Sequence, residues 1–149
     1  MKTAVRVIGL VFVVLIFSNL NGVAFGDTFC VDTSGELQNA LTTSASNGQD
    51  DVIWIVQGTY NGNFVYTSTE SYSLSVEGGY VSGCASRVVD PQNTVLDGGA
   101  SGSVMVISTQ STVLANFTIN GVNLKNGYIV PHGGGGLYIL SSDGNIILT

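Results

Sequence analysis

The sequence predicts an all-β fold, a parallel β-helix whose short strands stack into a solenoid with a short helix capping its N-terminal end. Two observations predict it. Short apolar runs bounded by Gly, Asn or Ser follow one another with no helical pattern between them. An apolar–polar–Gly triplet also recurs among these runs, which is typical of a repeating structure.

The apolar runs have the composition and length of short strands. Each is rich in Val, Ile, Leu, Phe or Tyr, the residues that favour a pleated and half-buried surface. Seven such runs begin at Val52, Ser73, Thr94, Val104, Phe117, Gly136 and Asn145. They are too short and too closely spaced for a fold built on long strands.

The recurring triplet gives the solenoid its predicted corners. Its glycines fall at intervals of 20, 20 and 23 residues, at Gly58, Gly78, Gly98 and Gly121. A period of this length without intervening helices predicts coils of two or three short strands, each strand pairing with its counterpart one coil away. Glycine suits the corners because a sharp bend often leaves no room for a Cβ atom.

The stretch around Gly121 shows how one corner would work. Phe117 and Ile119 alternate onto one face, the alternation breaks at Asn120-Gly121, and Val122 and Leu124 resume it. In a flat strand this slip would turn the apolar side chains to the wrong face. At a corner the slip keeps both arms pointing inward.

A short amphipathic helix is expected before the first of these runs. Thr33 and Glu36 have the spacing of a capping box, and Asn47-Gly48 is a stop signal. The apolar face would consist of Leu37, Ala40, Leu41 and Ala45. We expect this helix to cover the open end of the first coil, where unpaired edges would recruit another chain. A helix packed on the flank of a β-sandwich remains the alternative.

Residues 1–26 are predicted to be a secretory signal peptide, which leaves residues 27–149 as the cap and first coils. Lys2 and Arg6 precede an apolar run over residues 7–17, and cleavage would follow Ala24 or Gly26. The run is shorter than the roughly 18–20 residues that span a bilayer, and no later segment qualifies. The expected location is therefore secreted or on the outer cell surface, a bacterial outer membrane included.

The exported part is strongly acidic. Only Arg87 and Lys125 are basic, against ten acidic residues, so the net charge is about −8. Such a surface does not neutralise phosphates, which excludes nucleic acid as a partner. The two cysteines, Cys30 and Cys84, are expected to form a disulfide in an oxidising compartment, which would stabilise the fold by about 4 kcal/mol.

Several stretches resemble the N-terminal part of right-handed parallel β-helix proteins of the pectin-lyase-like superfamily, in particular large secreted or outer-surface β-helix proteins of bacteria. They are "VIWIVQGTYNGNF", "LSVEGGYVSGCASRVVDPQNTVLDGG", "INGVNLKNG" and "GGGLYI". The resemblance implies a right-handed helix, and it implies that a chain ending at "NIILT" is incomplete at the C-terminus. It leaves function open, because this superfamily contains lyases, glycoside hydrolases, tailspikes and adhesins.

No catalytic set is predicted within this chain. His132-Gly133 is superficially similar to the His-Gly pair of polygalacturonase-type hydrolases, and Asp50-Asp51 to their paired aspartates. Those carboxylates act as acid and base on neighbouring coils. Here they would lie several coils from His132, so the groups would not meet, and the glycines after His132 are expected to form a corner.

A calcium site is the one cofactor hypothesis. Glu77 and Asp97 occupy equivalent triplet positions, so they are expected to stack on adjacent coils at about 4.8 Å, where a cation would relieve their repulsion. Gln57 and Asn120 would extend that row. Arg87 is expected to pair with Asp90 or a neighbouring carboxylate, and would act as a lyase base only if its loop folds back over this face.

The leading functional prediction is an exported, non-catalytic surface or adhesin-like protein, with a polysaccharide or cell-surface glycan as the candidate ligand. Exposed aromatic rings that stack on sugars are expected at Tyr60, Tyr66, Tyr72, Tyr80 and Tyr128. The alternative is a polysaccharide lyase or glycoside hydrolase whose catalytic residues lie outside this chain, and a purely structural stalk is the third possibility.

Overall fold

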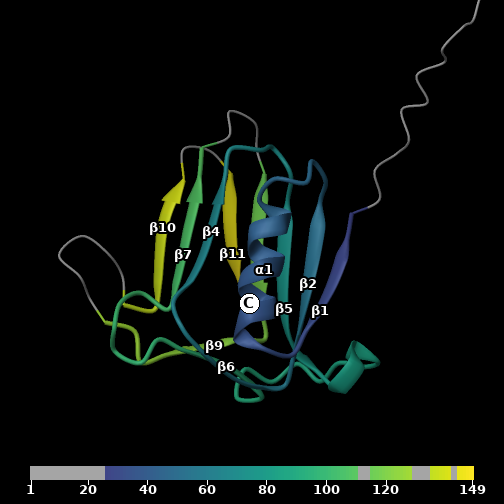
Figure 1. Cartoon of the computed structure of the whole chain (residues 1–149), viewed down its shortest axis with the longest axis vertical. Helices are drawn as coiled ribbons and strands as arrows, with labels where there is room; N and C mark the ends of the chain where they lie inside the picture. The colour runs from purple at the N-terminus through teal and green to yellow at the C-terminus, as the bar shows by residue number, and fades with distance from the viewer. Residues whose placement is uncertain (1–25, 111–114, 129–134, 142–143) are drawn as a thin grey trace, which may run out of the picture.

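The computed structural model describes residues 26–110, 115–128, 135–141 and 144–149 (Figure 1). This part of the chain is mostly β, with one α-helix and three parallel sheets. The signal peptide predicted over residues 1–26 lies outside the described residues except for Gly26, and so does His132.

Three sheets contain all the named strands. The five-stranded sheet has, in spatial order, β1 (Thr28–Val31), β2 (Asp51–Val56), β5 (Leu74–Tyr80), β8 (Asn116–Asn120) and β11 (Asn145–Leu148). A second sheet has β10 (Leu137–Ser141), β7 (Met105–Thr109) and β4 (Phe64–Ser68). The third has β3 (Gly58–Asn61), β6 (Thr94–Asp97) and β9 (Asn123–Lys125).

From β2 onward the chain visits the three sheets in turn. β2, β3 and β4 lie in different sheets, and β5, β6 and β7 then pair with them in the same order. β8, β9 and β10 follow the same rotation, and β11 returns to the five-stranded sheet beside β8. Each circuit of the chain therefore adds one parallel strand to each sheet.

The core lies between the three sheets and is built from apolar rows that run across the strands. In the five-stranded sheet Ile53 pairs with Val76 and Val76 with Ile119, and these three side chains are almost fully buried. Each buried aliphatic side chain contributes about 1.5–3 kcal/mol relative to exposure. The alternation predicted for Phe117 and Ile119 is confirmed, because both are buried.

The helix predicted before the first apolar run is confirmed as α1 (Ser34–Ser44). The Thr33 side chain accepts a hydrogen bond from the backbone N–H of Glu36 at 3.2 Å, which satisfies one free donor of the first turn. Leu37, Ala40 and Leu41 are buried, and the helix packs against β1, β2 and β4 (Figure 1). No helix within the described ranges is long and apolar enough to cross a membrane.

One side chain of α1 closes a sheet edge. β4 is an outer strand of its sheet, and Val65 lies in the middle of it. The Gln38 side-chain amide accepts from the Val65 N–H at 2.9 Å and donates to the Val65 carbonyl at 2.8 Å. This amide therefore bonds to the strand edge as a peptide group of a neighbouring strand would.

The predicted disulfide is present and links β1 to the segment after β5. It joins Cys30 to Cys84, which ends the short 3₁₀ turn η1 (Ser82–Cys84). The first strand is thereby tied covalently to the segment between β5 and β6, within the second circuit of the chain.

The four triplet glycines do not all occupy one kind of corner, which corrects the predicted repeat. Gly58 and Gly121 mark the passage from the five-stranded sheet to the β3-β6-β9 sheet, and Gly121 has a φ of +66°. Gly78 instead lies within β5, and Gly98 follows β6 at a different turn. The even spacing was misleading because residues 81–93 lengthen the second circuit between β5 and β6.

Candidate functional site

Four side chains form a row across the outer face of the five-stranded sheet. The register pairs Cys30 with Trp54, Trp54 with Glu77, and Glu77 with Asn120. They alternate with buried neighbours, so all four face away from the core. We call these four residues the outer row. Glu77 and Asn120 of the expected row are thus direct register partners, whereas the expected neighbour of Glu77 was Asp97.

Arg87 folds back over the outer row from the segment after β5. Its Nη1 lies 3.1 Å from Glu77 Oε2, and its Nε donates to the Gly78 carbonyl at 2.9 Å. Its Nη2 donates to the side-chain and backbone oxygens of Asn120. The guanidinium therefore binds β5 and β8 together. Arg87 was expected to pair with Asp90 or a neighbouring carboxylate, and its partner is the carboxylate of Glu77.

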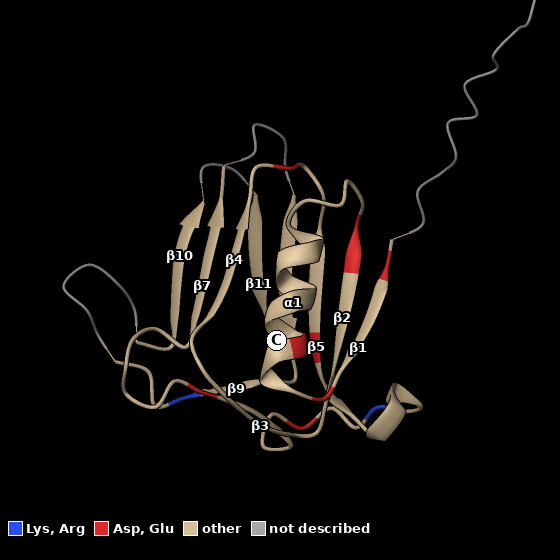
Figure 2. Cartoon of the chain, in the orientation of Figure 1, with Lys and Arg blue, Asp and Glu red and all other residues tan. Residues whose placement is uncertain are grey.

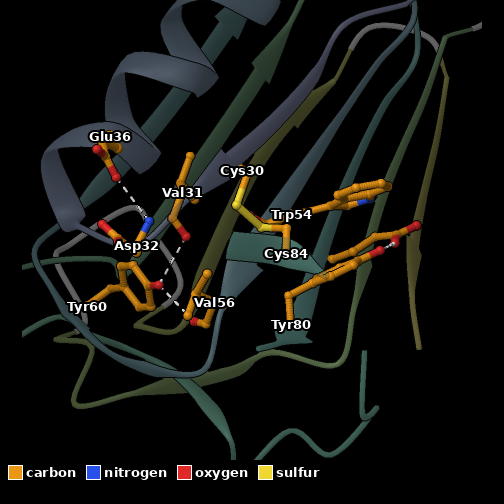
Figure 3. Close-up of a disulfide and its surroundings, with 10 residues drawn as sticks. Cys30, Val31, Asp32, Glu36, Trp54, Val56, Tyr60, Tyr80 and Cys84 are labelled. Atoms are coloured by element: carbon orange, nitrogen blue, oxygen red, sulfur yellow. Dashed lines mark hydrogen bonds between the residues drawn. A yellow bond between two sulfur atoms is a disulfide. The ribbon is translucent and has the colours of Figure 1, made fainter. Parts of the chain in front are cut away.

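Two aromatic rings stand beside this arginine. The rings of Trp54 and Tyr80 are stacked, with centroids 4.8 Å apart and an angle of 19° between planes, next to the disulfide (Figure 3). The Arg87 guanidinium carbon lies 5.4 Å from the centre of the Tyr80 ring, within cation–π range. Tyr80 itself is buried, while Trp54 remains partly exposed.

Both oxygens of the Glu77 carboxylate are occupied. Oε2 accepts from the Tyr80 hydroxyl at 2.8 Å as well as from Arg87, and Oε1 accepts from the Ser75 hydroxyl at 3.2 Å. Burial, followed by the bond and repulsion from Glu77, raises the pKa of Tyr80 to about 12. At neutral pH the phenol is therefore protonated, and both the phenol and the guanidinium donate hydrogen bonds to the Glu77 carboxylate.

The stacked carboxylates of the calcium hypothesis do not form. Glu77 is in β5 and Asp97 ends β6, which belongs to another sheet. Asp97 pairs with Asn61 and Lys125 in the register, and its carboxylate accepts from the Gly99 N–H at 2.9 Å. That hydrogen bond is the main cause that lowers the pKa of Asp97.

The part of the chain that the structure describes contains no cluster of metal-ligating side chains. Groups of three or more His, Cys, Asp or Glu side chains are absent there. Gln57, expected in the Glu77 row, lies just beyond the end of β2 and donates instead to the Gly79 carbonyl at 3.2 Å. A bulge after Trp54 shifts the pairing, so that Val56 meets Tyr80.

The paired aspartates have structural partners. Asp50 Oδ1 accepts from the Ser73 N–H at 2.6 Å, and Asp51 is buried as the first residue of β2. His132, the other member of the set that we excluded, lies outside the described residues. The two carboxylates therefore hold backbone groups at the start of the five-stranded sheet.

The expected tyrosine surface is largely wrong. Tyr60, Tyr66 and Tyr80 are at most 8% exposed, whereas Tyr72 and Tyr128 are exposed. Tyr60 and Tyr66 belong to the core, and Tyr80 is covered by its stack on Trp54 and by Arg87. The Tyr60 hydroxyl donates to the Val56 carbonyl at 2.7 Å, and its pKa is raised to about 12, mainly by burial. Two of the five rings, Tyr60 and Tyr66, thus stabilise the core, and Tyr80 stabilises the cluster around Arg87.

Sequence reasoning did not single out Trp54, the aromatic residue on the outer face. It is the only tryptophan in the chain and alternates with the buried Ile53 and Ile55. That alternation was the available signal, since it places the indole opposite the core. Comparison with known proteins gives no further guide: no family model, curated protein or solved structure matches the chain.

Proposed function

We propose that residues 27–149 form the N-terminal cap and first coils of a right-handed parallel β-helix related to the pectin-lyase-like superfamily. The rotation of the chain through three parallel sheets supports a solenoid, since each circuit adds one strand to every sheet. The position of α1 and the Gln38 amide supports a cap, because together they cover the first strands.

The proposed role is that of an exported, non-catalytic surface or adhesin-like protein. The Cys30–Cys84 disulfide supports an oxidising compartment, where such bonds persist. The full bonding of Arg87 and Glu77 supports a scaffold, because every polar atom that would take part in acid–base chemistry already has a protein partner. The proposed location is secreted or on the outer cell surface.

The proposed ligand is a polysaccharide or cell-surface glycan bound along the outer row. The observation that carries this proposal is the partly exposed indole of Trp54, held by its stack on Tyr80 and followed in the row by Glu77 and Asn120. Indole faces pack on the C–H faces of sugar rings, and a fixed ring loses little entropy on binding. Glu77 and Asn120 already bond to Tyr80, Arg87 and Thr149, so they would hold the row in place while the indole supplies the contact with the sugar.

The single tryptophan makes this proposal directly testable. Purified exported protein would be titrated with pectin, alginate and bacterial surface glycans while the fluorescence of Trp54 is recorded. A saturable change is expected for at least one glycan. Trp54→Ala is expected to lose that binding in a calorimetric titration, whereas Tyr128→Ala, a change at a ring 58% exposed outside the outer row, is expected to retain it.

Two outcomes would overturn the proposal. Equal affinity of Trp54→Ala and the unchanged protein would remove the outer row as the binding surface. Release of unsaturated sugars from pectin or alginate would favour the lyase alternative, in which the catalytic groups lie outside this chain.

A further inference from the structure

A carboxylate at the start of β2 is buried without a cationic partner among the described residues. Asp51 is 3% exposed. Its Oδ1 accepts from the backbone N–H of Asp27 at 2.8 Å, and its Oδ2 from the side-chain amide of Asn47 at 2.8 Å. The one ion pair in the described ranges joins Arg87 to Glu77. Burial of an ionised carboxylate is costly unless an opposite charge accompanies it.

The described residues around Asp51 supply no positive charge. Asp51 stands in an inward row of the five-stranded sheet, where its register partner is Leu74 and the next residue is Phe117. Acidic segments begin both β1 and β2, and the two basic segments lie at the other end of the strands (Figure 2). No lysine or arginine side chain of the described part therefore reaches this carboxylate.

A second buried atom nearby also lacks a partner. The Oδ1 atom of Asn47 is buried and accepts no hydrogen bond, although the Nδ2 atom of the same amide donates to Asp51. The position thus has one carboxylate without a positive charge and one amide oxygen without a donor. The backbone N–H of Asp27 supplies a single uncharged donor, whereas an α-ammonium group would supply three donors and a charge.

We propose that the leader is removed by hydrolysis of the Gly26–Asp27 peptide bond, and that the resulting α-ammonium group of Asp27 forms an ion pair with the buried Asp51 carboxylate. This inference rests on the proposed export of the chain. A protease of the signal-peptidase class adds water across the bond, which leaves a carboxylate on Gly26 and an amino group on Asp27. The amino group takes up a proton at neutral pH, and no other reactant is required.

Cleavage after Ala24 is the competing position, and it would leave Phe25 and Gly26 on the mature chain. Asp27 would then keep an uncharged peptide N–H, and Asp51 would stay without an opposite charge. Gly26 also lies where a side chain has no room, because a Cβ atom there would be 1.5 Å from the Asp50 carbonyl oxygen. Glycine has no Cβ atom and fits at this position, so the observation that favours Asp27 as the first residue is the buried Asp51 carboxylate without an opposite charge.

The cleavage position can be read directly. The full chain would be expressed in a bacterial host, and the intact mass of the exported protein would be measured. A mature chain that begins at Asp27 is expected. A chain that begins at Phe25 would overturn this inference while the export proposal stands, and a chain that keeps its leader would overturn both.

The ion pair needs a second measurement, because Asp51→Asn also weakens ordinary hydrogen bonds. Four mature chains would be compared by urea unfolding: chains that begin at Asp27 or at Phe25, each with Asp51 or with Asn at that position. An ion pair predicts that the substitution lowers the folding equilibrium constant about tenfold more in the chains that begin at Asp27. Equal effects in both backgrounds would overturn the pairing.

If Asp51→Asn does not fold, acetylation of the Asp27 amino group provides a second test of the ion pair. N-terminal acetylation of Asp27 removes the charge and leaves one N–H donor, so the hydrogen bond to Asp51 remains possible. The acetylated chain is expected to unfold at lower urea concentration than the free chain. The same urea midpoint for both chains would overturn the ion pair.

Discussion

Replacement of Gly78 by Ala tests whether the close approach of successive circuits holds the fold together. Gly78 lies in β5 beside the turn at Gly121. A Cβ atom added to Gly78 would meet the Gly121 carbonyl oxygen at 2.3 Å and the side chains of Thr94 and Val122 at 2.9 Å. Thr94 is fully buried and its hydroxyl accepts from the Gly79 N–H, so this neighbour has no free space to enter.

The expected cost follows from these contacts. Overpacking of a tight core costs roughly 1–3 kcal/mol and occasionally more. Because the added methyl group meets a backbone oxygen and two side chains at once, we expect Gly78→Ala to lower the free energy of unfolding by about 3 kcal/mol. For a domain of this size that corresponds to a fall in Tm of about 10–15 °C.

Gly35 provides a matched control within the same protein. It lies in α1, and no atom is within 4 Å of the position that its Cβ would take. Gly35→Ala is therefore expected to raise the free energy of unfolding by about 0.5–1 kcal/mol through helix propensity. Urea unfolding followed by circular dichroism measures both variants. An unchanged urea midpoint for Gly78→Ala, or an equal loss in both variants, would refute the argument from close approach.

Three further predictions concern the cap, the disulfide and the buried phenols. Thr33→Ala removes the N-cap hydrogen bond to the first turn of α1, and urea unfolding is expected to show a free energy of unfolding lower by about 1 kcal/mol. An unchanged free energy would contradict the N-cap role of Thr33. Reduction of Cys30–Cys84 is expected to lower the free energy of unfolding by about 4 kcal/mol in the same assay, and a shift below about 1 kcal/mol would disprove the role assigned to the bond. Tyr60 and Tyr80 have a pKa of about 12 in the folded chain against 10.0 ordinarily, so their contribution to stability is complete below about pH 10 and lost as the pH rises through 12. Ultraviolet titration is expected to show these phenols ionising last, and a single step near pH 10 for all tyrosines would contradict their burial.

Local signals in the sequence predicted most of the elements. The Thr33 and Glu36 spacing located the start of α1, since a cap depends only on residues three apart. The apolar runs located most strands, and the break at Gly121 located one true corner, after which Val122 and Leu124 pack against the core. The strands β1 and β4 were missed because their short runs mix apolar and polar residues.

The grouping of these elements into sheets was not predictable from the triplets. Glu77 and Asp97 have the same local pattern, yet Glu77 lies within β5 and Asp97 ends β6 in a different sheet. What separates them is the insertion over residues 81–93, whose path depends on a disulfide and on Arg87. Such long-range contacts leave no periodic trace in a single sequence.

The candidate site illustrates the same limit. Arg87 was considered as an ion-pair partner, but its actual acceptors come from β5 and β8, which are far apart in sequence. The burial of Tyr60 and Tyr66 depends on which side of a corner each residue falls, and the corners were only partly located. Alternation within a strand can be read from the local sequence. Which of the two alternating faces points toward the core can be determined only when the neighbouring strands are known.

The contact between Gln38 and Val65 has a consequence for self-association. A second chain can add to this edge of β4 only after the Gln38 amide has released both backbone groups. Because α1 also packs against β4, we expect the species that nucleates assembly at this edge to be one in which α1 has moved off the strand. The rate of any such assembly should follow the opening equilibrium of one helix, and the hydrogen exchange of the α1 amides would report that equilibrium.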